Sequence, residues 1–140
     1  MMRSVVMTGP GTFGFAEVSK PVPAEDQILI KVDCSVINPS DVLFITGKTG
    51  AKMAYPFTPG WEGAGTIEAT GAKLEGAGLV GKRVGFTRQG DPTHTIGGAM
   101  AEYAVTDVKS IIPLRDETTH EQGVALFVNP LTALCMIHRL

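Results

Sequence analysis

The sequence predicts a mainly β domain in which short strands alternate with turns and only short helices occur. Seventeen glycines and nine prolines in 140 residues are typical of a turn-rich chain rather than a helical bundle. Short apolar runs recur along the first two thirds, and glycine or proline follows each of them. The segment 27–37, QILIKVDCSVI, alternates apolar and polar residues, which is the period of a half-buried strand.

The strands are expected in a regular order along the chain. They cover residues 3–7, 13–18, 27–37, 64–70, 82–87, 99–105 and 108–112. A short helix should begin at Pro39 and run to about Thr46, where Gly47 stops it. A length of 140 residues is enough for one domain with a core of moderate size.

The last part of the chain is expected to be helical. Thr118 and Glu121 have the spacing of a capping box, which predicts a helix start there. Asn129 and Pro130 then interrupt this helix and favour a new start, with Asn129 as N-cap and Pro130 in the first turn.

The final helix carries an apolar face for which the chain offers no later element. This face is formed by Leu131, Leu134, Cys135 and Leu140. Either it packs back on the β domain, or a second domain that is absent from this chain covers it. We expect the second arrangement.

Charge and composition exclude several classes of partner. The formal net charge is −2 and no run of lysine or arginine occurs, so we expect no nucleic acid partner. No apolar run approaches the roughly 18 residues that span a bilayer, and the first residues lack a secretory apolar segment. Cys34 and Cys135 are isolated in apolar contexts, which predicts buried reduced thiols of a cytoplasmic protein, with a disulfide as the alternative.

Two segments, 9–14 and 76–81, match the letters of the dinucleotide fingerprint G-x-G-x-x-G. That fingerprint needs a strand before it and a helix after it, because the helix N-terminus meets the pyrophosphate. The first segment is soon followed by Pro21 and Pro23, and the second leads into an expected strand. Both are therefore interpreted as turns.

Five motifs occur in an order that is characteristic of one family. They are INPSD at 37–41, PGWEGAG at 59–65, VGKRV at 80–84, GGAMAEY at 97–103 and LFVNPLTA at 126–133. Together they resemble the N-terminal, GroES-like domain of the medium-chain dehydrogenase/reductase superfamily. The resemblance is strongest to the zinc-free quinone oxidoreductase-like branch.

This resemblance implies a partly open β-barrel with short helices that forms the substrate side of a cleft. A Rossmann domain that binds NADPH would follow beyond Leu140. Residues 1–125 would then be the substrate-side domain, and residues 126–140 would begin the helices that link it to the absent domain. The resemblance also implies a small-molecule substrate and a homodimer for the full-length protein.

The resemblance further implies that catalytic zinc is absent. Zinc-dependent members of the family place their ligands where this chain has Asn38, Trp61 and Val128. None of these side chains is a thiolate or an imidazole, which zinc prefers. The three histidines lie elsewhere and are interpreted as loop, cap-region and helix-surface residues: His94, His120 and His138.

Candidate site residues follow from the same alignment of motifs. The catalytic candidates are Asn38, Asp41 and Thr132; the cofactor-binding candidates are Asn38, Thr132 and Asn129; and the candidates for the substrate pocket are Trp61, Tyr55 and Leu43. Each has a structural alternative: Asn38 could cap the chain before Pro39, and Asp41 is favoured as a helix-start or ion-pairing residue. Trp61 and Tyr55 could be packing residues, and Glu62 is expected to pair with a basic group beneath the cleft.

The expected activity is NADPH-dependent hydride transfer to a quinone or an α,β-unsaturated carbonyl, without zinc. One alternative is an enoyl-thioester reductase. Related enzymes of that kind carry tyrosines where this chain has Leu43 and Thr49, and a threonine is a weak acid for that role. The other alternative is a non-catalytic GroES-like module.

Overall fold

The fold is described by a computed structural model for residues 1–48, 54–88 and 98–139. In this part of the chain, seven strands form two antiparallel sheets and the helices are short, so the predicted mainly β class is confirmed. The strands are β1 Met2–Gly9, β2 Thr12–Val18, β3 Gln27–Ser35, β4 Glu62–Thr70, β5 Arg83–Thr87, β6 Tyr103–Asp107 and β7 Ile111–Pro113. The helices are α1 Pro39–Ile45, α2 His120–Gly123 and α3 Val128–His138, with 3₁₀ turns at Ala72–Leu74 and Val108–Ser110.

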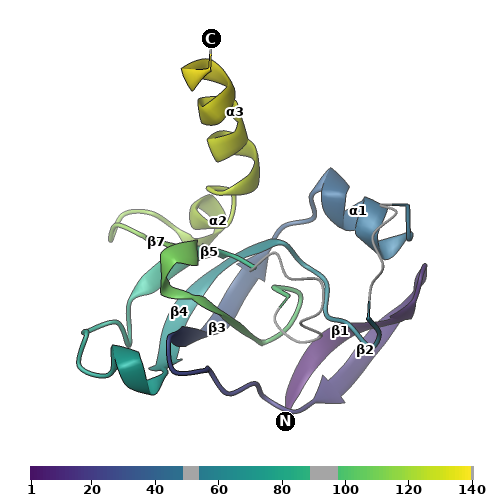
Figure 1. Ribbon diagram of the computed structural model, residues 1–140, viewed down its shortest axis with the longest axis horizontal. Coiled ribbons are helices and arrows are strands. Elements are labelled where there is room, and N and C mark those ends of the chain that lie inside the picture. Colours follow the sequence, from purple (N-terminus) through teal and green to yellow (C-terminus); the bar gives the residue numbers. More distant parts are fainter. Residues whose placement is uncertain (49–53, 89–97, 140) are drawn as a thin grey trace.

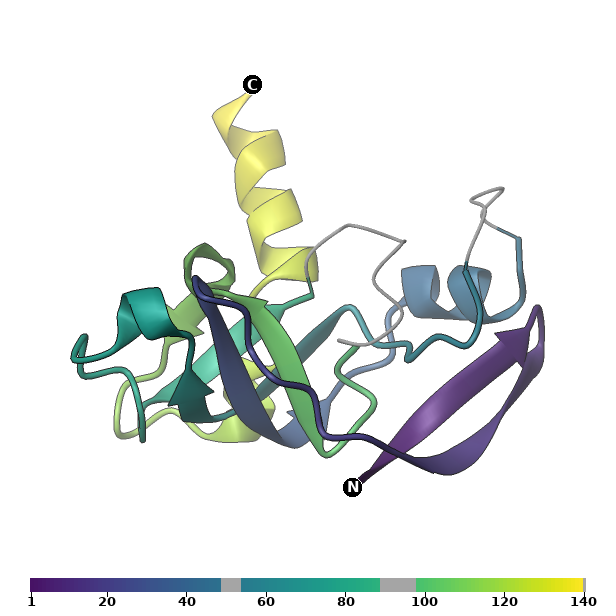
Figure 2. The ribbon, with the colours of Figure 1, turned by 60° about the horizontal axis from the view of Figure 1, so that its bottom comes forward.

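The larger sheet has the strand order β6-β3-β4-β5-β7 and does not close on itself (Figure 1). The second sheet is the β1–β2 hairpin, which lies beside the larger sheet and is joined to the rest by the isolated bridges Ser4–Ala101 and Met7–Phe57 (Figure 2). The result is the partly open barrel that the sequence predicts.

The core lies between the strands of the larger sheet and the segment that precedes β6. Its buried residues are Ile28, Ile30, Ile67, Val84, Phe86, Ala99 and Ala104. Alternation along β3 brings Ile28 and Ile30 into this core, as period two requires. The strand ends at Ser35, two residues earlier than predicted.

Close packing of β3 on β4 depends on a glycine. A Cβ atom at Gly65 would lie 2.1 Å from the carbonyl oxygen of Lys31, well inside van der Waals contact. Any larger residue at this position would push the two central strands apart. Gly65, the last residue of the motif at 59–65, is therefore needed for the close packing of β3 on β4.

Several predicted boundaries are wrong. Residues 99–102 form no strand except for the bridge at Ala101, because their backbone turns toward β1 instead: Val5 N donates to Met100 O, and Glu102 N donates to Arg3 O. The strand predicted at 108–112 begins as a 3₁₀ turn, and β7 covers only Ile111–Pro113.

Both glycine motifs are turns, as predicted. The first connects β1 to β2 through Gly11, whose φ is +70°. The second connects the turn at Ala72–Leu74 to β5, with positive φ at Gly76, Gly78 and Gly81. Neither segment leads into a helix.

Helix α3 projects away from both sheets (Figures 1 and 2). Its residues from Leu131 to Arg139 are exposed, so the alternative in which its apolar face packs back on the β domain is wrong. Cys135 lies on this helix and is exposed, contrary to the prediction of a buried thiol, whereas Cys34 on β3 is half-buried. Both cysteines are free thiols.

No helix among residues 1–48, 54–88 and 98–139 is long and apolar enough to cross a membrane.

Candidate functional site

The candidate site lies where three segments meet: the start of α1, the start of β4 and the start of α3. Its centre is Glu62, whose side chain is 1% exposed. One carboxylate oxygen accepts a hydrogen bond from Asn38 Nδ2 at 2.9 Å, and the other accepts from the backbone N–H of Val128 at 3.0 Å. Glu62 therefore joins residues that are far apart in the sequence.

The environment of Glu62 differs from the prediction. Among the residues that the structure describes, the two hydrogen bonds of its carboxylate come from Asn38 and Val128 and not from the expected basic group. Its partners are an amide group and the first N–H of α3. The positive end of a helix dipole lies at that N–H and compensates part of the cost of burying a carboxylate.

Asn38 is 3% exposed and both ends of its side-chain amide are bonded inside the protein. Nδ2 donates to Glu62, and Oδ1 accepts from Asn129 Nδ2 at 3.2 Å. Asn38 is also the residue before the first turn of α1, where Pro39 follows. It therefore holds three segments together, and little of its surface is open to a ligand.

Asp41 fixes the start of α1. Its carboxylate accepts from Asn38 N at 2.8 Å and from Trp61 N at 3.1 Å. Burial raises the pKa of Asp41 above its ordinary value, and these two backbone N–H bonds oppose that rise. The bond from Asn38 N supports the helix-start interpretation of this residue, and the bond from Trp61 N joins α1 to the residue before β4.

Trp61 is half-buried and packs edge-on against Phe44 of α1. The ring centroids are 4.8 Å apart and the rings are inclined by 73°. Phe44 was not among the predicted pocket residues. Its position three residues after Asp41, on the helix that Asp41 starts, is the signal that could have identified it.

The other two predicted pocket residues, Leu43 and Tyr55, differ in their relation to the Trp61–Phe44 pair. Leu43 is 47% exposed on α1, next in sequence to Phe44. Tyr55 is half-buried, and no hydrogen bond or ring contact joins it to the cluster among the described residues. Thr49 and His94 lie outside those residues.

The first turn of α3 carries the two remaining candidates. The helix begins at Val128, so Asn129 is its second residue and the predicted N-cap role of Asn129 is wrong; Phe127 occupies the cap position. The Asn129 side chain reaches back to Asn38 instead. Thr132 is exposed, and its hydroxyl donates to the carbonyl oxygen of Val128.

The three positions at which the resemblance places the zinc ligands of related enzymes lie close together here. Asn38 and Val128 both donate to Glu62, and Trp61 precedes Glu62 in the chain. Among the described residues, no three His, Cys, Asp or Glu side chains are grouped as they would be around a metal ion.

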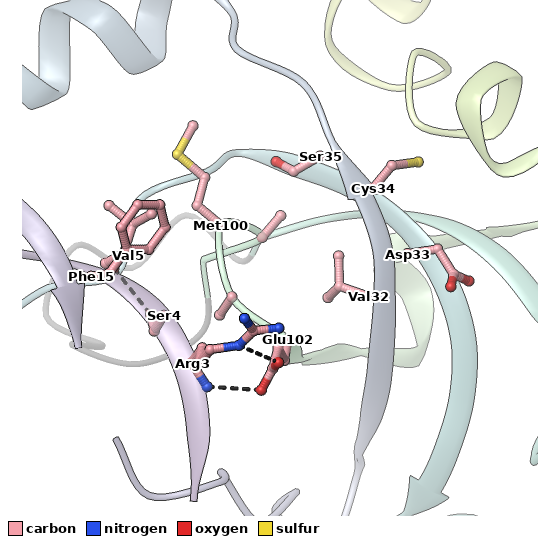
Figure 3. Close-up of a pocket in the computed structure, with 12 residues that line it drawn as sticks. Arg3, Ser4, Val5, Phe15, Val32, Asp33, Cys34, Ser35, Met100 and Glu102 are labelled. Carbon is pink, nitrogen blue, oxygen red and sulfur yellow. Dashed lines mark hydrogen bonds and ion pairs between the residues drawn. The ribbon is translucent and has the colours of Figure 1, made fainter. Parts of the chain in front are cut away.

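A cavity of about 410 Å³ lies outside this cluster, between β1, β3 and residues 99–102 (Figure 3). Its walls include Phe15, Val32, Cys34 and Met100, and Arg3 and Glu102 bind each other through two 2.8 Å hydrogen bonds at one end. None of the predicted site residues lines it.

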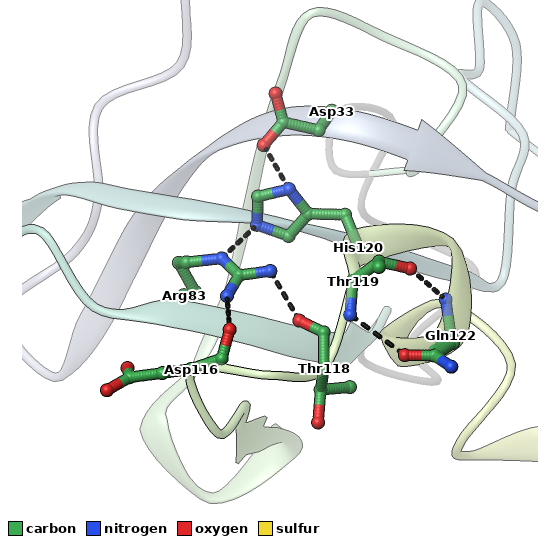
Figure 4. A network of polar contacts seen from close by, with 7 residues as sticks. All are labelled: Asp33, Arg83, Asp116, Thr118, Thr119, His120 and Gln122. Carbon is green, nitrogen blue, oxygen red and sulfur yellow. Dashed lines mark hydrogen bonds and ion pairs between the residues drawn. The ribbon is translucent and has the colours of Figure 1, made fainter.

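A second polar network surrounds the start of α2 (Figure 4). His120, the first residue of α2, lies 2.9 Å from Asp33 through Nδ1 and 3.4 Å from Arg83 Nε through Nε2. Arg83 also donates to the carbonyl oxygens of Asp116 and Thr118. The capping box of α2 is formed by Thr119 and Gln122, one residue later than predicted.

Comparison with known proteins gives a consistent result. The family model described as the alcohol dehydrogenase GroES-like domain matches residues 24–116. The quinone oxidoreductase of Lama guanicoe is 36% identical over 121 residues, which are 84% of this chain and 34% of that protein. The chain thus spans about a third of the length of that relative.

Solved structures agree with this match. A Mesorhizobium loti protein, provisionally assigned as an NADPH:quinone reductase, superposes with a TM-score of 0.86 at 36% identity, over 98% of this chain and 43% of that one. A mycobacterial protein solved in complex with NADPH has a TM-score of 0.79 at 27% identity, over 98% and 40% of the two chains.

Proposed function

The chain belongs to the family of alcohol dehydrogenase GroES-like domains. We propose that it is the substrate-side domain of an NADPH-dependent, zinc-free oxidoreductase. This enzyme would reduce quinones or α,β-unsaturated carbonyls. Residues 1–125 would form this domain, and residues 126–140 would begin the link to a dinucleotide-binding domain. Small-molecule substrates, a cytoplasmic location and a homodimeric state are parts of the same proposal.

The observation that carries the proposal is the chemistry of the convergent positions around Glu62. Asn38 offers an amide that is already bonded at both ends, Val128 a backbone N–H, and Trp61 an indole edge. None of the three supplies the thiolate or imidazole of a catalytic zinc site. Hydride acceptors that are already electron-poor suit such a site, because they need no Lewis acid.

The residues that remain open to ligands fit a cofactor and a flat apolar substrate. Asn129 and Thr132 are exposed polar side chains in the first turn of α3, and they would hold a polar group of NADPH. Trp61, Phe44 and Leu43 would form an apolar wall for the acceptor. When bound, NADPH supplies the hydride.

The test uses protein produced from the complete coding region that contains these 140 residues. NADPH oxidation is followed with a quinone, an enone and an enoyl-CoA, and bound metal is measured. We expect turnover of the quinone or the enone without stoichiometric zinc. Turnover of the enoyl-CoA alone would favour the enoyl-thioester reductase, and no oxidation with any acceptor would favour the non-catalytic module.

Thr132→Val is the informative variant, since it removes the hydroxyl at nearly constant volume. We expect kcat/KM to fall by about tenfold, the effect of losing one hydrogen bond. Thr12→Val, at the exposed start of β2, is the matched control and should leave kcat/KM unchanged. Equal values for the two variants would remove Thr132 from the proposed site.

A further inference from the structure

On the basis of the function proposed above, we propose that Glu62 is a positioning residue that fixes the direction of two side-chain amides in series. As a result, the exposed side chains of Asn129 and Thr132 present hydrogen-bond acceptors, and the ligand group that they bind is a donor such as a primary carboxamide.

The series starts at the carboxylate. The backbone N–H of Val128 can only donate, so the Glu62 oxygen that it contacts at 3.0 Å must accept. An ionised carboxylate has no hydrogen to give, so its other oxygen also accepts. The neighbour of that oxygen, 2.9 Å away, is Asn38, which must therefore present its NH₂ group.

The direction is then passed to Asn129. With its NH₂ group on Glu62, Asn38 has only its carbonyl oxygen to offer on the other side, and Asn129 Nδ2 donates to it at 3.2 Å. A flipped Asn38 would place two acceptors together at Glu62 and two donors together at Asn129. Asn38 is 3% exposed and Glu62 is 1% exposed, so water could not relieve the mismatch between these two side chains.

The surface of α3 shows the result. One N–H of the Asn129 NH₂ group is used by Asn38, and the Asn129 carbonyl oxygen accepts no hydrogen bond among the described residues. Thr132 gives its hydroxyl hydrogen to Val128 O, so its oxygen retains lone pairs for an acceptor role. Residues three apart share one face of a helix, so these two acceptors are neighbours.

The Asn129 carbonyl oxygen and the Thr132 oxygen are two neighbouring acceptors that match the two N–H bonds of an uncharged primary amide. The second N–H of Asn129 is the one donor beside them, so a phosphate group, which offers acceptors, would be matched less completely. The proposed role of Asn129 and Thr132 is therefore to accept hydrogen bonds from N–H groups of the cofactor. Glu62, 66 residues before Val128, sets this preference for N–H through the direction of the Asn38 and Asn129 amides.

The direction of the amides is measured directly by NMR on the 140-residue chain. Through-hydrogen-bond couplings should connect Asn38 Nδ2 with the Glu62 carboxyl carbon, and Asn129 Nδ2 with the Asn38 side-chain carbonyl. A coupling from Asn38 Nδ2 to the Asn129 side-chain carbonyl, or the absence of both expected couplings, would overturn the assignment. This measurement requires no ligand and no activity.

The ligand preference is measured on protein from the complete coding region. The KM for NADPH is compared with the KM for its reduced 3-acetylpyridine analogue, which replaces the carboxamide with an acetyl group and has no N–H. We expect a KM for the analogue about tenfold higher. Equal values would overturn the assignment of Asn129 and Thr132, even where NADPH oxidation itself upholds the proposed function.

Glu62→Gln tests the role of the carboxylate, because its amide can present an acceptor to only one of the two donors. In this variant the KM ratio should fall toward one, whereas kcat should change less. Glu62→Asp keeps two acceptor oxygens and should restore part of the ratio. The exposed Glu75→Gln is the matched control, and an unchanged ratio in Glu62→Gln would contradict the positioning role.

Discussion

Asn38 and Glu62 lie 24 residues apart and are joined by a buried hydrogen bond of 2.9 Å between Nδ2 and Oε1. The bond fastens the loop before α1 to the first residue of β4, and Val128 adds the first residue of α3 to the same carboxylate. One side chain thus determines how the three elements of the candidate site are placed. The consequences for stability and chemistry can be measured residue by residue.

Gly65→Ala should be strongly destabilising. The added Cβ would lie 2.1 Å from Lys31 O, so β3 and β4 would have to separate at the centre of the sheet. We expect a loss of about 3 kcal/mol or more in the free energy of unfolding, measured with urea. Gly14→Ala on β2 is the control, since its Cβ would meet no atom within 4 Å. Equal losses would show that the approach of the strands is not limiting.

Phe44→Leu should change the emission of Trp61, the only tryptophan of the chain. The variant removes the ring whose centroid lies 4.8 Å from that of the indole, so we expect emission at longer wavelength. The loss of stability should be about 1–2 kcal/mol. Phe15→Leu, at a position that is 90% exposed, should alter neither quantity. An unchanged spectrum in Phe44→Leu would argue against the aromatic wall.

The two cysteines should differ in reactivity. Burial raises the pKa of the Cys34 thiol, and the nearby carboxylates of Glu121 and Asp33 raise it further. A raised pKa means that the reactive thiolate forms only above the pH range of an ordinary thiol. We expect iodoacetamide to label the exposed Cys135 first at neutral pH and Cys34 only as the pH increases. Mass spectrometry of the labelled peptides gives the order, and early labelling of Cys34 would contradict it.

Arg83→Lys should loosen the segment before α2. The guanidinium donates in several directions at once, to Asp116 O, Thr118 O and His120 Nε2, and an ammonium group cannot reproduce this planar geometry. We expect a loss of about 1–2 kcal/mol in unfolding free energy. Arg115→Lys, at an exposed position in the same segment, is the matched control. An equal loss of unfolding free energy in both variants would indicate that the hydrogen bonds of Arg83 contribute little.

The elements predicted well are those whose pattern is contained in a few consecutive residues. The period of β3 is visible in eleven consecutive residues, and α1 lies between Pro39 at its start and Gly47 with a φ of +71° after its end. Segment 99–102 was misassigned because its partner, β1, is almost a hundred residues earlier. Its backbone hydrogen bonds go to Arg3 and Val5, which no local pattern indicates.

The candidate site shows the same division. The motifs predict Asn38, Asp41 and Trp61 as site residues, and the structure brings the three together around α1 and the start of β4. The hydrogen bonds of Glu62 were not predictable, because Glu62 and Val128 are 66 residues apart and no local pattern links them. Asn129 illustrates this limit: Asn before Pro is a common N-cap pattern, but the first turn of α3 starts one residue earlier and the side chain is used by Asn38.

Helix α3 extends from the candidate site and is long relative to its attachment there. Its 11 residues extend about 16 Å, and within the described segments the bonds that join it to the site come from Val128 and Asn129 near its start. A tilt of about 10° at that end would move the far end by roughly 3 Å. Any change in the direction of the helix at the Val128–Glu62 bond would therefore displace the far end more than the start.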